Sequence, residues 1–170
     1  DNELSERQNN LIFYIGQALK IKHNDIVALQ EFVMGRDADE LSSKNILIID
    51  EGTDGEQYAG PNIVAKNLTG LITILRLPDA EPYFIKYLGI STLYLNSISI
   101  KSRKIDVFPT GSTIRGNKIE PIYYSDIIGK FLISENKVKI TFTADHIFYH
   151  FKSGKAGLQN INIAEQGGKL

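Results

Sequence analysis

The sequence predicts a mainly β protein of the α+β class, with an N-terminal helical hairpin, a β-sandwich and a C-terminal antiparallel β extension. Three patterns predict this order. Apolar residues first recur at helical spacing, then occur in short runs between turn residues, and finally alternate with polar residues. The predicted domains cover residues 1–37, 45–135 and 136–170.

Two amphipathic helices are expected to form the hairpin. The first covers residues 3–21, where one side is apolar and the other polar. We expect Asn24 or Asp25 to cap the second helix and Gly35 to end it, because these residue types favour helix starts and ends. The apolar stripes contain Leu4, Leu11, Ile12, Ile15, Leu19, Ile26, Leu29, Phe32 and Val33.

Beyond Asp37 the pattern becomes that of β-strands. Residues 45–50 form a short apolar run between polar clusters, which predicts a buried strand. Many short strands separated by Gly, Pro and Asn turns are typical of a sandwich or small barrel. Residues 125–130 are predicted to form one helical turn. The further strand candidates are residues 70–77, 82–88, 92–95, 98–101, 104–108, 113–116 and 121–124.

The C-terminal extension is predicted to contain three strands. Val138, Ile140 and Phe142 alternate with polar residues, which predicts a half-buried strand. The second strand covers residues 147–151 and the third 158–163, with a turn between them. Strands with free edges seek partners, so we expect the extension to add to the sandwich or to pair with a second copy of the chain.

The bulk composition is that of an ordinary globular protein. The 170 residues are 42% hydrophobic and 23% charged, and a formal net charge of -1 gives no reason to expect nucleic acid as a partner. There is no cysteine, which excludes disulfides and thiolate chemistry. No apolar run approaches the roughly 20 residues that span a bilayer. A cytoplasmic location is expected.

The last segment resembles the start of an ATP-binding cassette ATPase. That family opens with a strand ending in an aromatic residue, a turn, a Leu-x-x-(Ile/Val)-x-(Ile/Leu/Phe) strand and a glycine turn, ahead of the phosphate-binding Walker A loop. The resemblance covers about a fifth of the chain and implies that the chain stops before that loop. The matching residues are Val138-Lys-Ile-Thr-Phe-Thr-Ala-Asp-His-Ile-Phe-Tyr-His-Phe-Lys-Ser-Gly154, Gly157-Leu-Gln-Asn-Ile-Asn-Ile163 and Gly168-Lys-Leu170.

The cassette resemblance implies one nucleotide-binding residue. Tyr149 falls near the aromatic position that stacks on adenine in the family, and a tyrosine ring suits a flat base. The competing interpretation is an inward-facing strand aromatic. Residues 153–157 lack the spacing of a phosphate loop and read as a turn. We expect no cofactor in this chain, and ATP with Mg²⁺ only in the parent protein.

Residues 70–126 resemble the later strands of a forkhead-associated domain, a phosphothreonine-binding β-sandwich. Asn96 lies close to the family's conserved asparagine position. The Gly-Arg pair, however, is Gly35-Arg36 at a helix end, and no Ser-x-x-His is present, so the phosphate contacts of the family are missing. The residues that carry this resemblance are Tyr83–Gly89, Leu93–Asn96, Ile100, Ile105, Phe108 and Gly111–Arg115.

Together the resemblances imply a non-catalytic accessory region of a bacterial transporter ATP-binding protein. It would dock to or regulate the ATPase, at the inner face of the membrane, with the remaining cassette and the membrane domain as partners. The alternative is a phosphopeptide-binding module. For that alternative, Asn96, Arg103 and Arg115 form the expected anion or peptide rim, extended by Lys101 and Lys104.

Metal binding and acid–base catalysis find little support. His146 and His150 share a predicted strand face but would lie about 13 Å apart, too far to share a metal ion. The acidic residues Asp50, Glu51, Asp54 and Glu56 lack the spacing of a calcium loop, so a solvated turn is the simpler interpretation.

Overall fold

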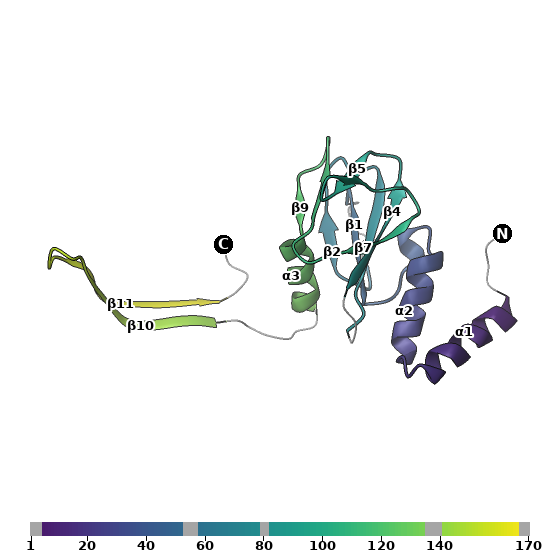
Figure 1. The fold of residues 1–170 in the computed structure, drawn as a ribbon, viewed down its shortest axis with the longest axis horizontal. Coiled ribbons are helices and arrows are strands. Elements are labelled where there is room, and N and C mark those ends of the chain that lie inside the picture. Colours follow the sequence, from purple (N-terminus) through teal and green to yellow (C-terminus); the bar gives the residue numbers. More distant parts are fainter. Residues whose placement is uncertain (1–4, 53–57, 79–81, 135–140, 167–170) are drawn as a thin grey trace. The chain divides into compact units, whose positions relative to one another are not determined.

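The computed structural model describes residues 5–52, 58–78, 82–134 and 141–166 (Figure 1). The chain divides into two compact units, Asp1–Glu135 and Asn136–Leu170. The first unit contains α1 (Glu6–Ala18), α2 (His23–Met34), the 3-10 helix η1 (Ala38–Glu40), β1 (Ile46–Asp50), β2 (Asn62–Val64), β3 (Gly70–Leu75), β4 (Tyr83–Gly89), β5 (Leu93–Leu95), β6 (Ile98–Ser99), β7 (Ile105–Phe108), β8 (Thr113–Gly116), β9 (Ile122–Tyr123) and α3 (Tyr124–Ser134). The second unit contains β10 (Thr141–His150) and β11 (Ala156–Gln166).

Two sheets build the first unit, as the mainly β prediction requires. The larger has the strand order β2-β1-β3-β4-β7, and the smaller has the order β6-β5-β8-β9. Only β1 and β2 run parallel among the described pairs; the others are antiparallel. Inward residues of both sheets form one core because side chains alternate along a strand. They include Ile72, Ile74, Ile85 and Tyr87 from the larger sheet and Leu93, Ile114 and Ile122 from the smaller.

The second helix covers the outer face of the larger sheet. Ala28 and Phe32, one helical turn apart, are buried against Ile46, Ile48 and Leu75. These sheet residues alternate with the inward ones, so the larger sheet is apolar on both faces. The first unit is therefore layered as helix, sheet and sheet.

Helix α3 corrects the prediction of a single helical turn. It has 11 residues, and the Asp126 carboxylate near its start accepts a hydrogen bond of 3.0 Å from the Tyr123 backbone N–H. Ile127 and Phe131, four residues apart, are buried in the core between the sheets. Strand β2 is a second feature that the sequence did not predict.

The helix caps also differ from the prediction. Ser5 caps α1 in a capping box with Gln8. Helix α2 begins at His23, before the expected caps, and its N-cap Lys22 makes no side-chain capping bond. Asp25 instead accepts a 3.0 Å hydrogen bond from Asn45 Nδ2, which ties the helix start to the residue before β1.

The second unit is a two-stranded sheet in which β10 and β11 pair antiparallel with each other. The sequence predicted one strand through Val138, Ile140 and Phe142 and a second at 147–151. This separation is wrong, because β10 is continuous from Thr141 to His150. Register shifts between Ala144 and Ile147 mark a bulge there, and His146 has a φ of 53°. Val138 and Ile140 lie outside the described residues. In the strand order of the described residues, β10 and β11 form a sheet of their own, so that order gives no support for the expected addition to the sandwich.

Among the described residues, no helix combines the length and apolar character needed to cross a membrane.

Candidate functional site

The predicted rim residue Asn96 sits in the turn between β5 and β6. Asn96 and Ser97 have φ values of 49° and 72°, a left-handed conformation that asparagine tolerates well. The Asn96 Nδ2 donates to Ser112 Oγ over 3.0 Å, and its Oδ1 accepts from the Thr113 N–H over 3.0 Å. Ser112 is fully buried. The Asn96 amide therefore fastens the turn to the start of β8.

The two rim arginines occupy different places. Arg115 is exposed on β8, directly opposite Tyr94 of β5 in the strand register. Arg103 is exposed in the turn before β7, with a φ of 64° and its N–H bonded to the Tyr87 carbonyl over 2.7 Å. Within the part of the chain that the structure describes, no hydrogen bond or ion pair joins the side chains of Asn96, Arg103 and Arg115.

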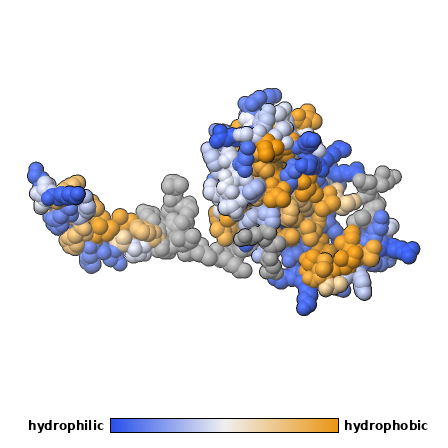
Figure 2. All heavy atoms as spheres, in the orientation of Figure 1, coloured by the Kyte–Doolittle hydropathy of each residue, from blue (hydrophilic) through white to orange (hydrophobic). Residues whose placement is uncertain are grey.

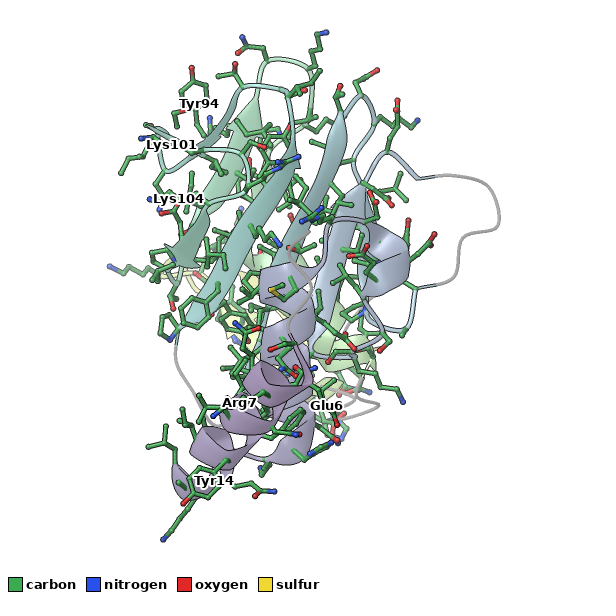
Figure 3. All side chains as sticks on the ribbon, turned by 90° about the vertical axis from the view of Figure 1, so that its right-hand side faces the viewer. Glu6, Arg7, Tyr14, Tyr94, Lys101 and Lys104 are labelled. Atoms are coloured by element: carbon green, nitrogen blue, oxygen red, sulfur yellow. The ribbon has the colours of Figure 1, made fainter. Side chains whose placement is uncertain are left out.

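A groove of about 470 Å³ lies between the β5–β6 turn and β7. Its walls are mainly apolar, with Lys101, Lys104 and Asp106 at the rim. Lys104 and Asp106 form an exposed ion pair. Figure 3 shows Lys101 and Lys104 projecting from one edge of the first unit, with Tyr94 nearby. The apolar lining consists of Leu95, Ile98, Ile100, Val107 and Pro109.

A second hollow of about 520 Å³ lies between the β2 region and α3. Its lining contains both lysines and carboxylates, so no single charge dominates that would select a ligand. Its charged residues are Lys66, Lys118, Lys130, Glu120 and Asp126.

Tyr149 lies on β10 in the second unit and is 51% exposed. Its ring makes an edge-to-face contact with Phe151, with 5.1 Å between ring centroids. Both rings lie against Gly157 of β11, where an added Cβ would meet each ring at 2.9 Å. The glycine thus makes room for an aromatic pair, and an exposed aromatic surface remains available for stacking on a planar group.

The histidine pair and the acidic turn are the two places where the sequence analysis argued against a metal site. His146 and His150 are exposed, and His146 Nδ1 lies 2.6 Å from Asn160 Oδ1. In the acidic turn, the Asp50 carboxylate accepts from the Gly52 N–H and from the Tyr58 hydroxyl. Asp54 and Glu56 lie outside the described residues. Among the residues that are described, no group of three acidic or imidazole side chains is placed to hold a metal ion.

Lys86 is a buried cation that the sequence reasoning missed. Its Nζ, at the α2 C-terminus, donates to the carbonyls of Phe32, Val33 and Gly35 over 3.0, 2.9 and 2.7 Å. Burial lowers the pKa of Lys86, and the Glu40 carboxylate opposes this effect. The signal was a lysine in the middle of an apolar strand, Tyr-Phe-Ile-Lys-Tyr-Leu over residues 83–88.

No protein-family model, curated protein or solved structure matches this chain.

Proposed function

We propose that this chain is a non-catalytic accessory region of a transporter ATP-binding protein, joined to the opening strands of its ATP-binding cassette. The first unit would dock to or regulate the ATPase at the inner face of the membrane. The second unit would contribute Tyr149 to the adenine site of the parent protein, where ATP and Mg²⁺ bind.

The observation that carries the proposal is the exposed apolar surface of the β10–β11 ribbon. A two-stranded sheet alone is at best marginally stable in water. Apolar side chains at this density on so small a sheet are typical of strands that are completed by another surface. The exposed large apolar residues of the ribbon are Phe142, Phe148, Tyr149, Phe151, Leu158, Ile161 and Ile163.

Helix α1 supports the docking role of the first unit. Leu11, Ile15 and Leu19 are exposed at four-residue spacing, so they form an apolar stripe that no other described element covers. Figure 2 shows this hydrophobic surface on the helical part of the unit. A stripe of this kind suits packing against another protein surface.

Nucleotide titration tests the proposal. The chain 1–170 should show negligible Mg-ATP binding, because it lacks the backbone N–H cradle and lysine of a phosphate loop. The parent protein should bind Mg-ATP, and Tyr149→Ala should weaken that binding about tenfold, as expected for loss of a stacking contact of 1–3 kcal/mol. Tyr149→Trp should retain it.

Phe148→Ala is the matched control, since Phe148 is also an exposed aromatic on β10. It should leave the affinity unchanged. A parent protein without a Gly-Lys-Ser/Thr loop after the ribbon, or equal affinities for all three variants, would rule out the assignment.

A further inference from the structure

Strand β7 leaves one edge of the larger sheet unpaired. It is the last strand in the order and, among the described residues, pairs only with β4, through Ile105–Phe108. In an antiparallel pair, every second residue directs its N–H and C=O away from the partner strand. Within the described residues, no other strand forms hydrogen bonds with these outward-facing N–H and C=O groups. The edge of β7 is thus able to pair with one more extended strand.

The neighbouring edge belongs to the smaller sheet, and no described strand pairs with it either. Strand β6 ends that sheet, and its Ile98 is 75% exposed. Across the groove, Val107 of β7 is 47% exposed. In Figure 2, hydrophobic atoms gather on the face of the first unit where β7 runs in Figure 1. Two unpaired edges therefore border one apolar groove.

The positive charges beside the β7 edge favour an added strand that carries negative charge. Lys101, Arg103 and Lys104 lie within four residues and are all exposed, and Asp106 neutralises only Lys104. This cluster contrasts with a chain whose net charge is -1. Two copies paired along β7 would bring two such clusters to one sheet, which disfavours self-association.

We propose that the β7 edge binds an extended acidic peptide by strand addition. Backbone hydrogen bonds to β7 would hold the peptide, an apolar side chain would enter the groove beside Ile98, and Asp or Glu side chains would face Lys101 and Arg103. This recognition differs from phosphothreonine binding through Asn96, whose amide already bonds Ser112 and Thr113. It does not depend on the nucleotide proposal.

A pool of terminally blocked eight-residue peptides alternating Asp or Glu with Val, Ile or Leu tests this directly. Titrated into ¹⁵N-labelled chain, the pool should shift the amides of Ile105–Phe108 and Ile98. N-methylation of alternate peptide bonds should abolish the shifts, because it removes the donors that pair with β7. A pool with Lys in place of the acids should not bind.

Two pairs of matched variants locate the site. Ile98→Asp changes the apolar groove and Lys101→Glu changes the charge, and each should weaken peptide binding about tenfold. Their controls are Ile90→Asp and Lys118→Glu, which make the same changes at exposed residues outside the groove and should leave the affinity within about twofold. Equal melting temperatures of each variant and its control would show that the loss of binding is not caused by unfolding.

Three results would overturn the proposal. The first is the absence of amide shifts at peptide concentrations up to about 1 mM, because a Kd above that value is too weak for specific recognition by strand addition. The second is binding that the N-methylated pool retains. The third is binding of phosphothreonine peptides alone, with shifts at Asn96 and Arg115 rather than β7, which would assign the phosphopeptide function instead.

Discussion

Lys86 of β4 donates from its Nζ to the carbonyl oxygen of Gly35, the residue that ends α2, over 2.7 Å. The same ammonium serves the carbonyls of Phe32 and Val33. The last carbonyls of a helix have no partners within the helix and carry partial negative charge. A lysine from the sheet therefore caps the helix that covers that sheet.

Replacing this lysine should destabilise the first unit. Lys86→Met leaves the three carbonyls without their donor and should lower the free energy of unfolding by about 3 kcal/mol. Thermal unfolding should show a drop in Tm of roughly 6–12 °C for a chain of this size. Lys130→Met, at an exposed position, should change stability by less than about 0.5 kcal/mol. Similar losses for both variants would contradict the capping role.

The lowered pKa of Lys86 predicts a pH dependence. Between that lowered pKa and the ordinary value of 10.5, the unfolded chain binds more protons at this residue than the folded chain. The stability of the natural protein relative to Lys86→Met should therefore rise as the pH is raised through this window. Denaturant titrations of both proteins at several alkaline pH values measure the difference. A relative stability that falls with pH would show that the three carbonyls raise the pKa instead.

Two glycines should respond in opposite directions to alanine. Gly70 has a φ of 91°, and a Cβ there would overlap the Leu88 carbonyl oxygen of the neighbouring strand. Gly70→Ala should thus destabilise by about 3 kcal/mol. At Gly129, in α3, an added Cβ would meet no atom within 4 Å outside the helix's own backbone, so Gly129→Ala should stabilise by about 0.5–1 kcal/mol. Urea unfolding of both variants gives the two signs, and a shared sign would contradict the local geometry.

Variants of Asn96 should separate its side-chain bonds from its backbone conformation. Asn96→Gly keeps the left-handed backbone but removes the bonds to Ser112 and Thr113, and should cost about 1–2 kcal/mol. Asn96→Ala adds the strain of φ 49° and should be less stable again by about 1 kcal/mol. The expected order of midpoints in urea is natural protein, glycine variant, alanine variant. Equal stability of all three would mean that the amide is free for a ligand.

Hydrogen exchange should distinguish the two units. Amides of β10 and β11 are expected to exchange far faster than those of β3 and β4, because the ribbon buries few of its apolar side chains. The measurement is exchange followed by mass spectrometry on the chain 1–170 at low concentration. Slow exchange in the ribbon that depends on concentration would instead support the predicted homodimer through these strands.

Periodicity alone predicted most elements of the first unit. The apolar run of β1 and the turns around β5 to β8 could be predicted, because short strands are recognised from local apolar patterns and from the turn residues that bound them. Strand β2 was missed because three residues are too few to show an alternating pattern, and its parallel pairing with β1 is not visible in the sequence. The length of helix α3 was underestimated because Ile127 and Phe131 are buried by contacts with the core of the two sheets, which the local sequence does not show.

The candidate site shows the same division. The sequence by itself determined the class of fold and the presence of several positive residues at 101–104. Only the tertiary structure decided that Asn96 is fastened to Ser112, that Lys86 caps α2, and that β6 and β7 end their sheets beside one groove. Strand order and buried polar contacts depend on residues far apart in the chain, and local patterns carry no information about which of those residues meet.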